Sequence, residues 1–322
     1  MVRIANADYA WKIAMHALWY TTICEFLYIS CSNAQPSYDA WQLQQLETAG
    51  AVWNSWDMSS VADLGPDLYK WNGDAFVPII CKLYFAPQKA DGVLVVDPLT
   101  NTSDTTTIAG FGVNVVKWLD IIYVHTAKKL YFCPYDADNV LVVDPMTNAS
   151  DTTALDGLGV GGGRGWRRVF VPTTQKLYFA PINADNVLIV DPMTNASDIT
   201  AIAGFAGNNK WAGVVFASTT GKLYFSPARN DAMLIVDPST NASDTTAISG
   251  FGITSSYKWR GGVFVTTTGK IYFPPCSADG VLVVDPTTNV SDTAFAGFGV
   301  RDKWNDVVFL HATGKLYFSP EA

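Results

Sequence analysis

Short runs of Val, Ile, Leu, Phe and Tyr alternate with turn residues along the chain from about residue 70 to its end. Between residues 261 and 297 four such runs follow one another: GGVFVT, KIYFPP, VLVVDP and DTAFAG. Runs of this length, rich in β-branched and aromatic residues and bounded by Gly, Pro, Asn or Asp, are typical of strands. The pattern therefore predicts four short strands in this stretch.

The residues between the runs predict how the strands connect. Thr-Thr-Gly joins the first two, and Gly269 supplies the positive φ of a tight turn. Asp-Gly or Asp-Asn joins the second to the third, as at Asp91-Gly92 and Asp138-Asn139. Asp-Pro-x-Thr-Asn then leads into the fourth. Each unit is thus expected to be an antiparallel meander.

The unit repeats along the chain. Lys-(Leu/Ile)-Tyr-Phe begins at Lys82, Lys129, Lys176, Lys222, Lys270 and Lys315, with spacings of 47, 47, 46, 48 and 45 residues. A tryptophan stands ten or eleven residues before each copy: Trp71, Trp118, Trp166, Trp211, Trp259 and Trp304. Repeats of this length with four strands each are typical of a β-propeller, although an open solenoid is the competing arrangement.

The last repeat stops after its second strand, which would leave strand edges exposed in an open ring. Upstream of Trp71 the chain reads AVWNSWDMSSVADLGPDLYKW, where Asp57 takes the Asp-Pro position and VADLG takes the place of a fourth strand. The sequence therefore predicts an all-β, six-bladed propeller over residues 41–322, closed by a composite blade from both ends of the chain.

At these residues the chain resembles the YVTN-type propeller repeat, which also has a glycine turn, a Lys-x-Tyr strand, a Val-x-Val-Ile-Asp strand and a Thr-Asn turn. The resemblance covers about residues 70–322. This sequence differs in carrying Tyr-Phe-x-Pro where Tyr-Val-x-Asn is usual, and in its added tryptophan. Because that group spans surface proteins, binding modules and a few lyases, the resemblance implies an architecture and no particular activity.

Residues 1–40 do not fit the repeat and are expected to form an apolar helical segment. The stretch from Tyr9 to Ser30 is interrupted by Lys12, His16 and Glu25, and its uncharged run is too short to cross a bilayer. Three interpretations stay open: a signal peptide cleaved after Ser32-Asn33-Ala34, a membrane anchor making contact through residues 9–30, or a helix docked on the propeller or a partner. A membrane-associated or secreted location is expected over a free cytosolic one.

Composition narrows the classes of function. The hydrophobic fraction of 49% and the net charge of −8 indicate a folded, acidic protein and argue against nucleic acid as a partner. The five cysteines, Cys24, Cys31, Cys81, Cys133 and Cys276, are odd in number and occupy unrelated repeat positions, which indicates free thiols. Neither His125 nor His311 has an acidic or cysteine companion nearby in sequence. We therefore expect no metal, no cofactor and no catalytic site.

One rim of the ring gathers the first set of candidate binding residues. Besides the six tryptophans, it contains five lysines and five aspartates: Lys70, Lys117, Lys210, Lys258, Lys303, Asp91, Asp138, Asp185, Asp231 and Asp279. They form either local ion pairs around buried tryptophans or pockets in which Trp stacks against a sugar and Asp accepts its hydroxyl protons. In the second case the arrangement is similar to tachylectin-type lectin propellers.

The Asp-Pro-x-Thr-Asn turns hold a second set. Five glycosylation sequons begin at Asn101, Asn148, Asn195, Asn241 and Asn289. The alternative is that Asn and Ser are turn residues copied with the repeat. The paired carboxylates, such as Asp144 and Asp151, lack the glycine and the alternating oxygen ligands of a calcium loop, so turn roles are expected for them.

The third candidate is the one place where the repeat is broken, GVGGGRGWRR from Gly159 to Arg168. Its arginines, Arg164, Arg167 and Arg168, are expected on a glycine-rich loop, where they either recognise an acidic partner or anionic headgroup or are simply solvated.

These observations predict a non-catalytic structural or protein-binding scaffold, in which partners bind through the rim or the N-terminal segment, within a membrane-associated or larger assembly. A secreted carbohydrate-binding propeller is the alternative. A lyase of the kind found among similar propellers is a third hypothesis.

Overall fold

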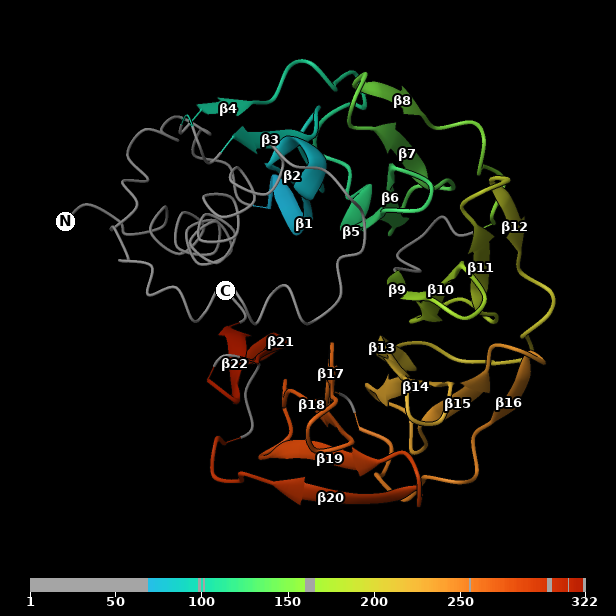
Figure 1. The fold of residues 1–322 in the computed structure, drawn as a ribbon. Coiled ribbons are helices and arrows are strands. Elements are labelled where there is room, and N and C mark those ends of the chain that lie inside the picture. The colour runs from blue at the N-terminus through green and yellow to red at the C-terminus, as the bar shows by residue number, and fades with distance from the viewer. Residues whose placement is uncertain are drawn as a thin grey trace.

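The computed structural model describes residues 69–97, 100, 102–159, 166–254, 256–299, 303–311 and 313–320. The expected N-terminal segment, the boundary near residue 40 and the upstream half of the composite blade lie outside these residues. Within the described part, five four-stranded antiparallel sheets and one two-stranded sheet surround a central axis (Figure 1). We call each sheet a blade and number the blades from the N-terminus.

The strands of a blade run outward in chain order, with the first strand nearest the axis. The first strands are β1 (Trp71–Val77), β5 (Trp118–Val124), β9 (Trp166–Val171), β13 (Trp211–Ala217), β17 (Val263–Val265) and β21 (Trp304–Leu310). The second strands are β2 (Lys82–Pro87), β6 (Lys129–Pro134), β10 (Lys176–Pro181), β14 (Lys222–Pro227), β18 (Lys270–Phe273) and β22 (Lys315–Pro320).

Blades 1 to 5 add two outer strands. The third strands are β3 (Leu94–Asp97), β7 (Leu141–Asp144), β11 (Leu188–Asp191), β15 (Leu234–Asp237) and β19 (Val281–Asp285). The fourth strands are β4 (Thr102–Asp104), β8 (Ala149–Asp151), β12 (Ala196–Asp198), β16 (Ala242–Asp244) and β20 (Val290–Ala294). A 3₁₀ turn, η2 (Pro78–Ile80), replaces the usual turn between β1 and β2. The four-stranded meander predicted from the sequence is confirmed.

Apolar residues of neighbouring blades pack together, so the hydrophobic core consists of a series of seams between blades. One seam joins Tyr131 and Val142 of blade 2 to Leu177 and Phe179 of blade 3, and equivalent clusters join the neighbouring pairs. The second strands of blades 1 to 4 are nearly continuously buried, as in KLYFCP of β6. A single blade cannot cover both of its faces, which is why the units stack side by side.

A hydrogen bond repeats across the seams. The hydroxyl of the tyrosine in Lys-Leu-Tyr-Phe donates to the carbonyl oxygen of the proline in the next blade's Asp-Pro turn: Tyr84 to Pro145 at 3.5 Å, Tyr131 to Pro192 at 2.8 Å, Tyr178 to Pro238 at 3.1 Å and Tyr224 to Pro286 at 2.9 Å. We call this contact the tyrosine clamp. It stabilises the order of the blades because each clamp binds one blade to its successor.

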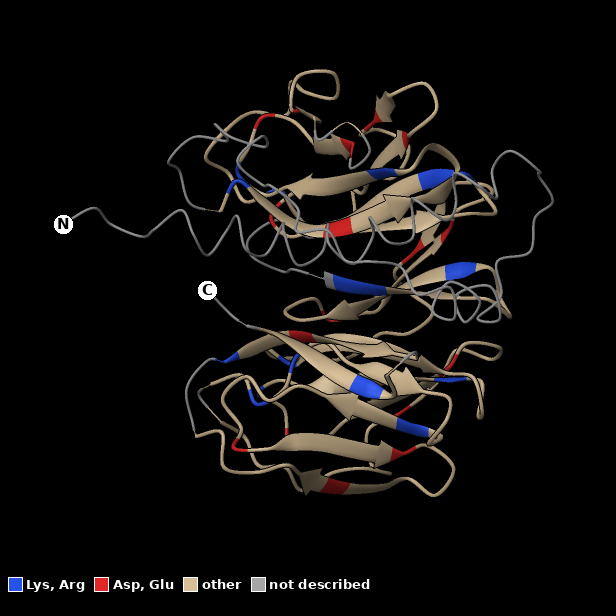
Figure 2. Cartoon of the chain, turned by 60° about the vertical axis from the view of Figure 1, so that its left-hand side comes forward, with Lys and Arg blue, Asp and Glu red and all other residues tan. Residues whose placement is uncertain are grey.

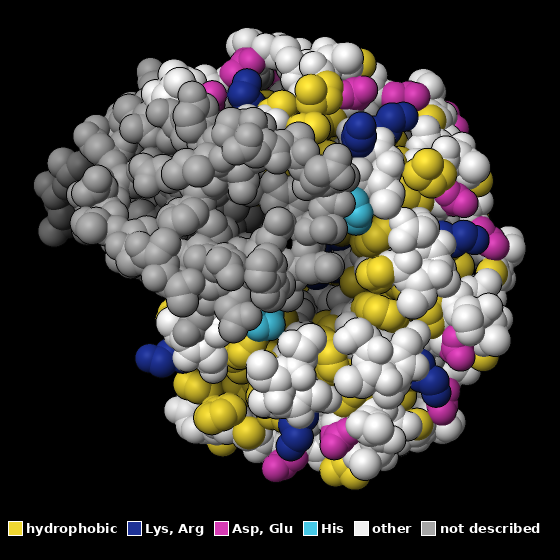
Figure 3. All heavy atoms as spheres, viewed as in Figure 1, with side chains coloured by type: hydrophobic (Ala, Val, Ile, Leu, Met, Phe, Trp, Pro, Cys, Tyr) yellow, Lys and Arg dark blue, Asp and Glu magenta, His cyan; other side chains and the backbone are white. Residues whose placement is uncertain are grey.

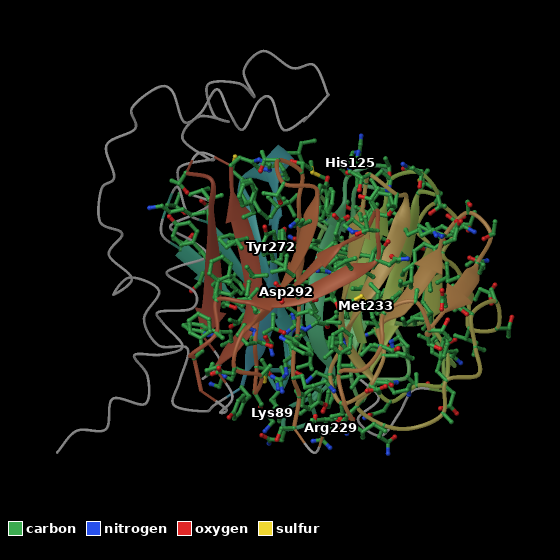
Figure 4. The ribbon with its side chains drawn as sticks, turned by 90° about the horizontal axis from the view of Figure 1, so that it is seen from below. Lys89, His125, Arg229, Met233, Tyr272 and Asp292 are labelled. Atoms are coloured by element: carbon green, nitrogen blue, oxygen red, sulfur yellow. The ribbon has the colours of Figure 1, made fainter. Side chains whose placement is uncertain are left out.

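The blades present two different faces. The turn face carries the connections between first and second strands, and the loop face carries the inter-blade loops and the hairpins between second and third strands. Figure 4 shows His125 on the turn face, and Lys89 and Arg229 at the opposite end of the molecule. Basic and acidic residues are interspersed through the described part, with acidic residues at several strand ends (Figure 2).

The β21–β22 hairpin differs from the other blades in its exposure. Tyr317 of β22 is 42% exposed, whereas its equivalents Tyr84, Tyr131, Tyr178 and Tyr224 are no more than 1% exposed. Val308 on the same hairpin is 41% exposed. In the described part of the chain we find no helix with the length and hydropathy of a membrane span.

Candidate functional site

The repeat tryptophans lie in the core of the blades. Trp71, Trp118, Trp211 and Trp259 are between 2% and 5% exposed. The indole N–H of each donates to a carbonyl oxygen in the hairpin between the second and third strands, for example Trp118 to Asn139 at 3.0 Å and Trp211 to Ala232 at 2.9 Å. Phenylalanines of the inter-blade loops meet these rings edge to face. These four tryptophans therefore stabilise blades and offer no open face to a sugar, whereas Trp304 is partly exposed.

The rim aspartates bind inter-blade loops of their own chain. The Asp91 carboxylate accepts from the N–H groups of Gly110 and Gly112 at 3.1 and 2.7 Å, and Asp231 and Asp279 do the same with later glycine pairs. For Asp138 and Asp185 it is the backbone carbonyl oxygen that accepts, from Leu158 and Phe205. These residues hold the loops that lead into the next blade.

The rim lysines bind the same loops from the other side. The Lys258 ammonium group donates to the carbonyl oxygens of Asn230 and Gly252 at 2.8 and 2.5 Å, and Lys117 and Lys303 repeat the arrangement. Lys210 donates to Gly207, and Lys70 lies 6.0 Å from the Trp71 ring. Burial lowers the pKa of Lys258 to about 8 and also lowers that of Lys117. These lysines are parts of the scaffold.

The sequon asparagines occupy left-handed turn positions. Asn148, Asn195, Asn241 and Asn289 have φ between 55° and 59°, a region that Asn tolerates better than most residues. The Asn195 side-chain oxygen also accepts from the Tyr131 hydroxyl at 3.1 Å, which extends a tyrosine clamp. Asn101 lies outside the described residues. This turn geometry accounts for the repeated asparagine, and glycosylation stays a prediction.

The cysteines and histidines form no chemical cluster in the part of the chain that the structure describes. Cys81, Cys133 and Cys276 are buried, and no group of three potential metal ligands occurs among the described residues. Histidine side chains, cyan in Figure 3, lie on the face shown there. The His125 and His311 rings contact Phe170 and Phe309.

The structure differs from the expected arginine-rich loop at two of its three arginines. Arg167 and Arg168 lie on β9, the strand of blade 3 nearest the axis, and Arg164 lies outside the described residues. Both side chains are about one-quarter exposed and bind acidic residues of other blades. Arg167 and Arg168 therefore lie among other charged residues at the axis.

Arg168 and Asp120 form the first half of this axial charge cluster. An Arg168 terminal nitrogen lies 3.1 Å from an Asp120 carboxylate oxygen, and the guanidinium also donates to the Ile121 carbonyl oxygen. Asp120 accepts from the Ile121 N–H at 2.9 Å. Burial raises the pKa of the Asp120 carboxyl even though the guanidinium opposes this. Burial works against the Arg168 charge, but Asp120 raises its pKa and keeps it ionised.

Arg167 forms the second half and reaches across the axis. Its two terminal nitrogens bind Asp306 at 3.0 Å and the Asn305 side-chain oxygen at 2.7 Å, both on β21. Blade 3 and the β21–β22 hairpin are not neighbours in the arrangement of Figure 1, so these contacts bridge the centre of the molecule. The Asp306 side chain remains 49% exposed. We call Asp120, Arg167, Arg168, Asn305 and Asp306 the axial cluster.

The cluster lies near the residue two positions after each repeat tryptophan. These axial positions are Gly73, Asp120, Arg168, Gly213, Gly261 and Asp306. Blade 3 has one residue fewer in this stretch, so Arg167 pairs with Ala180 as Asp120 pairs with Cys133. Neighbouring first strands come so close here that a Cβ on Gly73 would lie 2.7 Å from the Asp120 Cα, and one on Gly213 would overlap the Gly261 backbone. Glycine is therefore required where two backbones touch, and the remaining axial positions carry charge.

Sequence reasoning missed Asp120, Asn305 and Asp306 as site residues, although the repeat contained the signal. Alignment on the tryptophans shows that the axial position holds Gly, Asp or Arg, while the second-last position of the same strand is Phe or Tyr in every repeat. A position that varies in charge within a conserved geometry is free of the packing constraint and available for chemistry.

Neither a family model nor a curated protein sequence matches the chain. Solved structures do. The chain is similar to a streptogramin B lyase (TM-score 0.60, 11% identity, 80% of this chain and 78% of that one) and to virginiamycin B lyase from Staphylococcus aureus (0.56, 11%, 78% and 77%). It is also similar to a nidogen/laminin complex structure (0.50, 15%, 77% and 82%). These likenesses show a β-propeller fold, and the YVTN-type resemblance is supported only at this level.

The neighbours correct one expectation from the sequence. The prediction of a non-catalytic scaffold is not supported, because the solved structures that share this fold include lyases as well as a nidogen/laminin complex, and likenesses of 11–15% identity show the fold alone. That prediction rested on the lack of a histidine- or cysteine-based site, and it overlooked charged residues brought together from distant repeats. The carbohydrate-binding alternative also loses four of its six expected stacking residues, since Trp71, Trp118, Trp211 and Trp259 are buried.

Proposed function

We propose that this protein is a propeller enzyme that carries out acid–base chemistry on a small polar substrate at the axial cluster. The observation that carries the proposal is the pair of arginine–aspartate contacts, Arg168–Asp120 and Arg167–Asp306, that meet at the centre of the molecule. The Arg168–Asp120 pair is largely buried, and buried ion pairs contribute little to stability compared with apolar residues of similar volume. A chemical role would account for this pair at the axis.

The two aspartates have different surroundings, as acid–base pairs in enzymes do. Asp120 is largely buried and burial raises its pKa, which suits a group that takes up and releases a proton. Asp306 is half-exposed and beside the Arg167 guanidinium, which suits a group that positions substrate. The arginines would stabilise negative charge that develops on the substrate. The lyase neighbours support a reaction of this broad type at the level of the fold.

A turnover screen tests the proposal. The full chain is incubated with a panel of small lactones, esters and substrates for elimination, and Asp120→Asn is compared with the wild type and with Asp151→Asn, which changes an exposed aspartate on β8. We expect Asp120→Asn to lower kcat at least 100-fold, with Asp151→Asn unchanged. Equal activity of all three proteins, or no turnover of any substrate, would contradict it.

We also propose that the ring has six blades and that upstream residues complete the β21–β22 hairpin. The exposure of Tyr317 and Val308 supports this, because their side of the hairpin corresponds to a seam elsewhere. The alignment of Asp57 and VADLG with a third and fourth strand supports it too. Deletion of residues 315–322 should then unfold the whole ring. A stable remainder that has lost a single blade would contradict closure.

A further inference from the structure

A second group of charged residues lies on the loop face, outside the axial cluster. Arg229 belongs to the hairpin of blade 4 and Tyr257 to the loop between blades 4 and 5. Arg260 directly follows Trp259. The guanidinium carbon of Arg229 lies 5.2 Å from the centre of the Tyr257 ring, and that of Arg260 lies 4.4 Å from it. Both guanidinium groups therefore make a cation–π contact with the same tyrosine ring.

Hydrogen bonds between neighbouring loops also hold this arrangement in place. The Tyr257 hydroxyl donates to the Asn209 side chain, and the backbone N–H of Asn209 donates to the Asn183 side-chain oxygen at 2.6 Å. The backbone N–H of Arg229 donates to the Asn209 carbonyl oxygen at 2.9 Å. These contacts fix the Tyr257 ring and the Arg229 backbone relative to each other.

Arg229 lacks the partner that a buried cation normally has. Its Nε is buried, and no hydrogen-bond acceptor among the described residues reaches it. A buried donor without an acceptor costs about 1–3 kcal/mol. An oxyanion would supply the missing acceptor, since arginine forks bind carboxylate and phosphate in matching geometry.

We infer that Arg229, Tyr257 and Arg260 form a binding site for an oxyanion, the carboxylate or phosphate group of a small molecule. The site adjoins the axial cluster, because Gly261, which follows Arg260, approaches the Asp306 carboxylate. The acidic group of a substrate held here leaves the rest of that molecule within reach of the axial aspartates. This assignment of substrate class rests on the proposed function, whereas anion binding itself does not.

Calorimetric titration of the full chain at low salt tests the site, with inorganic phosphate and benzoate as separate probes. We expect one probe, or both, to bind with one-to-one stoichiometry, and Arg229→Gln to weaken that binding at least tenfold. Tighter binding of benzoate than of phosphate would assign a carboxylate ligand, and the reverse order a phosphate. Arg229→Lys keeps the charge without the fork and should retain part of the affinity.

Lys89→Gln is the matched control, because Lys89 is the equivalent hairpin residue of blade 1 and lies 5.3 Å from the Tyr69 ring. It should bind the probes within twofold of the wild type. Unchanged binding in Arg229→Gln, equal loss in Lys89→Gln, or no binding of either probe at millimolar concentration would overturn the site. Asp120→Asn separates the two proposals, since it should abolish turnover and leave probe binding intact.

Discussion

The seams between blades and the axis at their centre follow opposite rules. At the seams the same contact recurs, with the Tyr131 hydroxyl on Pro192 repeated by Tyr178 on Pro238 and Tyr224 on Pro286. At the axis the same structural position holds glycine, aspartate or arginine. Repeated residues therefore build the ring, and the residues that differ between repeats are the ones available for chemistry.

The largest expected effect comes from a substitution that disrupts a seam between blades. Trp211→Ala removes a buried indole, its hydrogen bond to Ala232 and its contact with Phe205. We expect the free energy of unfolding to fall by about 3–5 kcal/mol, as for other large buried aromatic residues. Urea denaturation measures this. Ile253→Ala, at a position that is 84% exposed, should change stability by less than about 0.5 kcal/mol.

The second prediction concerns a substitution in the axial cluster. Arg168→Met leaves the Asp120 carboxylate buried without its guanidinium partner and should lower stability by about 3 kcal/mol at pH 7. Because the pKa of Asp120 is raised by burial, protonation at lower pH removes the uncompensated charge and should reduce the loss. The double variant with Asp120→Asn should recover most of it. Denaturation at several pH values tests this, and a loss that does not change with pH would contradict it.

The third prediction sharpens the comparison between seams. Tyr131→Phe leaves the buried Pro192 carbonyl oxygen without its donor, which should lower stability by about 1–2 kcal/mol. Tyr317→Phe is the matched change on the β21–β22 hairpin, where the ring is 42% exposed, and its effect should be below about 0.5 kcal/mol. Equal effects of both substitutions on urea denaturation would show that the clamp adds nothing.

The smallest expected effect depends on pH. Burial lowers the pKa of Lys258 to about 8, so between pH 8 and 10.5 the unfolded chain binds more protons at this residue than the folded chain does. The free energy of unfolding should therefore rise with pH across that range, by about 1 kcal/mol. Lys258→Met loses two hydrogen bonds, and this contribution to the pH dependence should disappear. An identical pH profile in both proteins would refute this role of Lys258.

The fold could be predicted from the sequence because its determinants are local and repeated. Gly269 in a turn, the Asp-Gly hairpins and the run Lys-Leu-Tyr-Phe each report their own backbone geometry. The sequence is compatible with both buried and exposed tryptophans, and the packing of Phe251 against Trp259 and its equivalents decides between them.

The candidate site could not be predicted in the same way. Arg167 and Asp306 are 139 residues apart and meet across the axis, a contact that no local pattern reports. The glycine run before Trp166 suggested a loop as far as Arg168, whereas pairing of Arg168 with Phe179 places it in a strand. Distance along the chain and competition between loop and strand signals therefore hid the axial cluster.

The tyrosine clamps give the ring a direction. Each hydroxyl holds the turn of the following blade, and in the described chain the series ends at Pro286 of blade 5. Loosening of that last turn breaks one clamp. Loosening of a middle blade breaks two clamps: the one that its turn accepts from the preceding blade and the one that its own tyrosine donates to the following blade. Thermal fraying should thus travel from the C-terminal end backwards, with amide protons of β19 exchanging with solvent before those of β7.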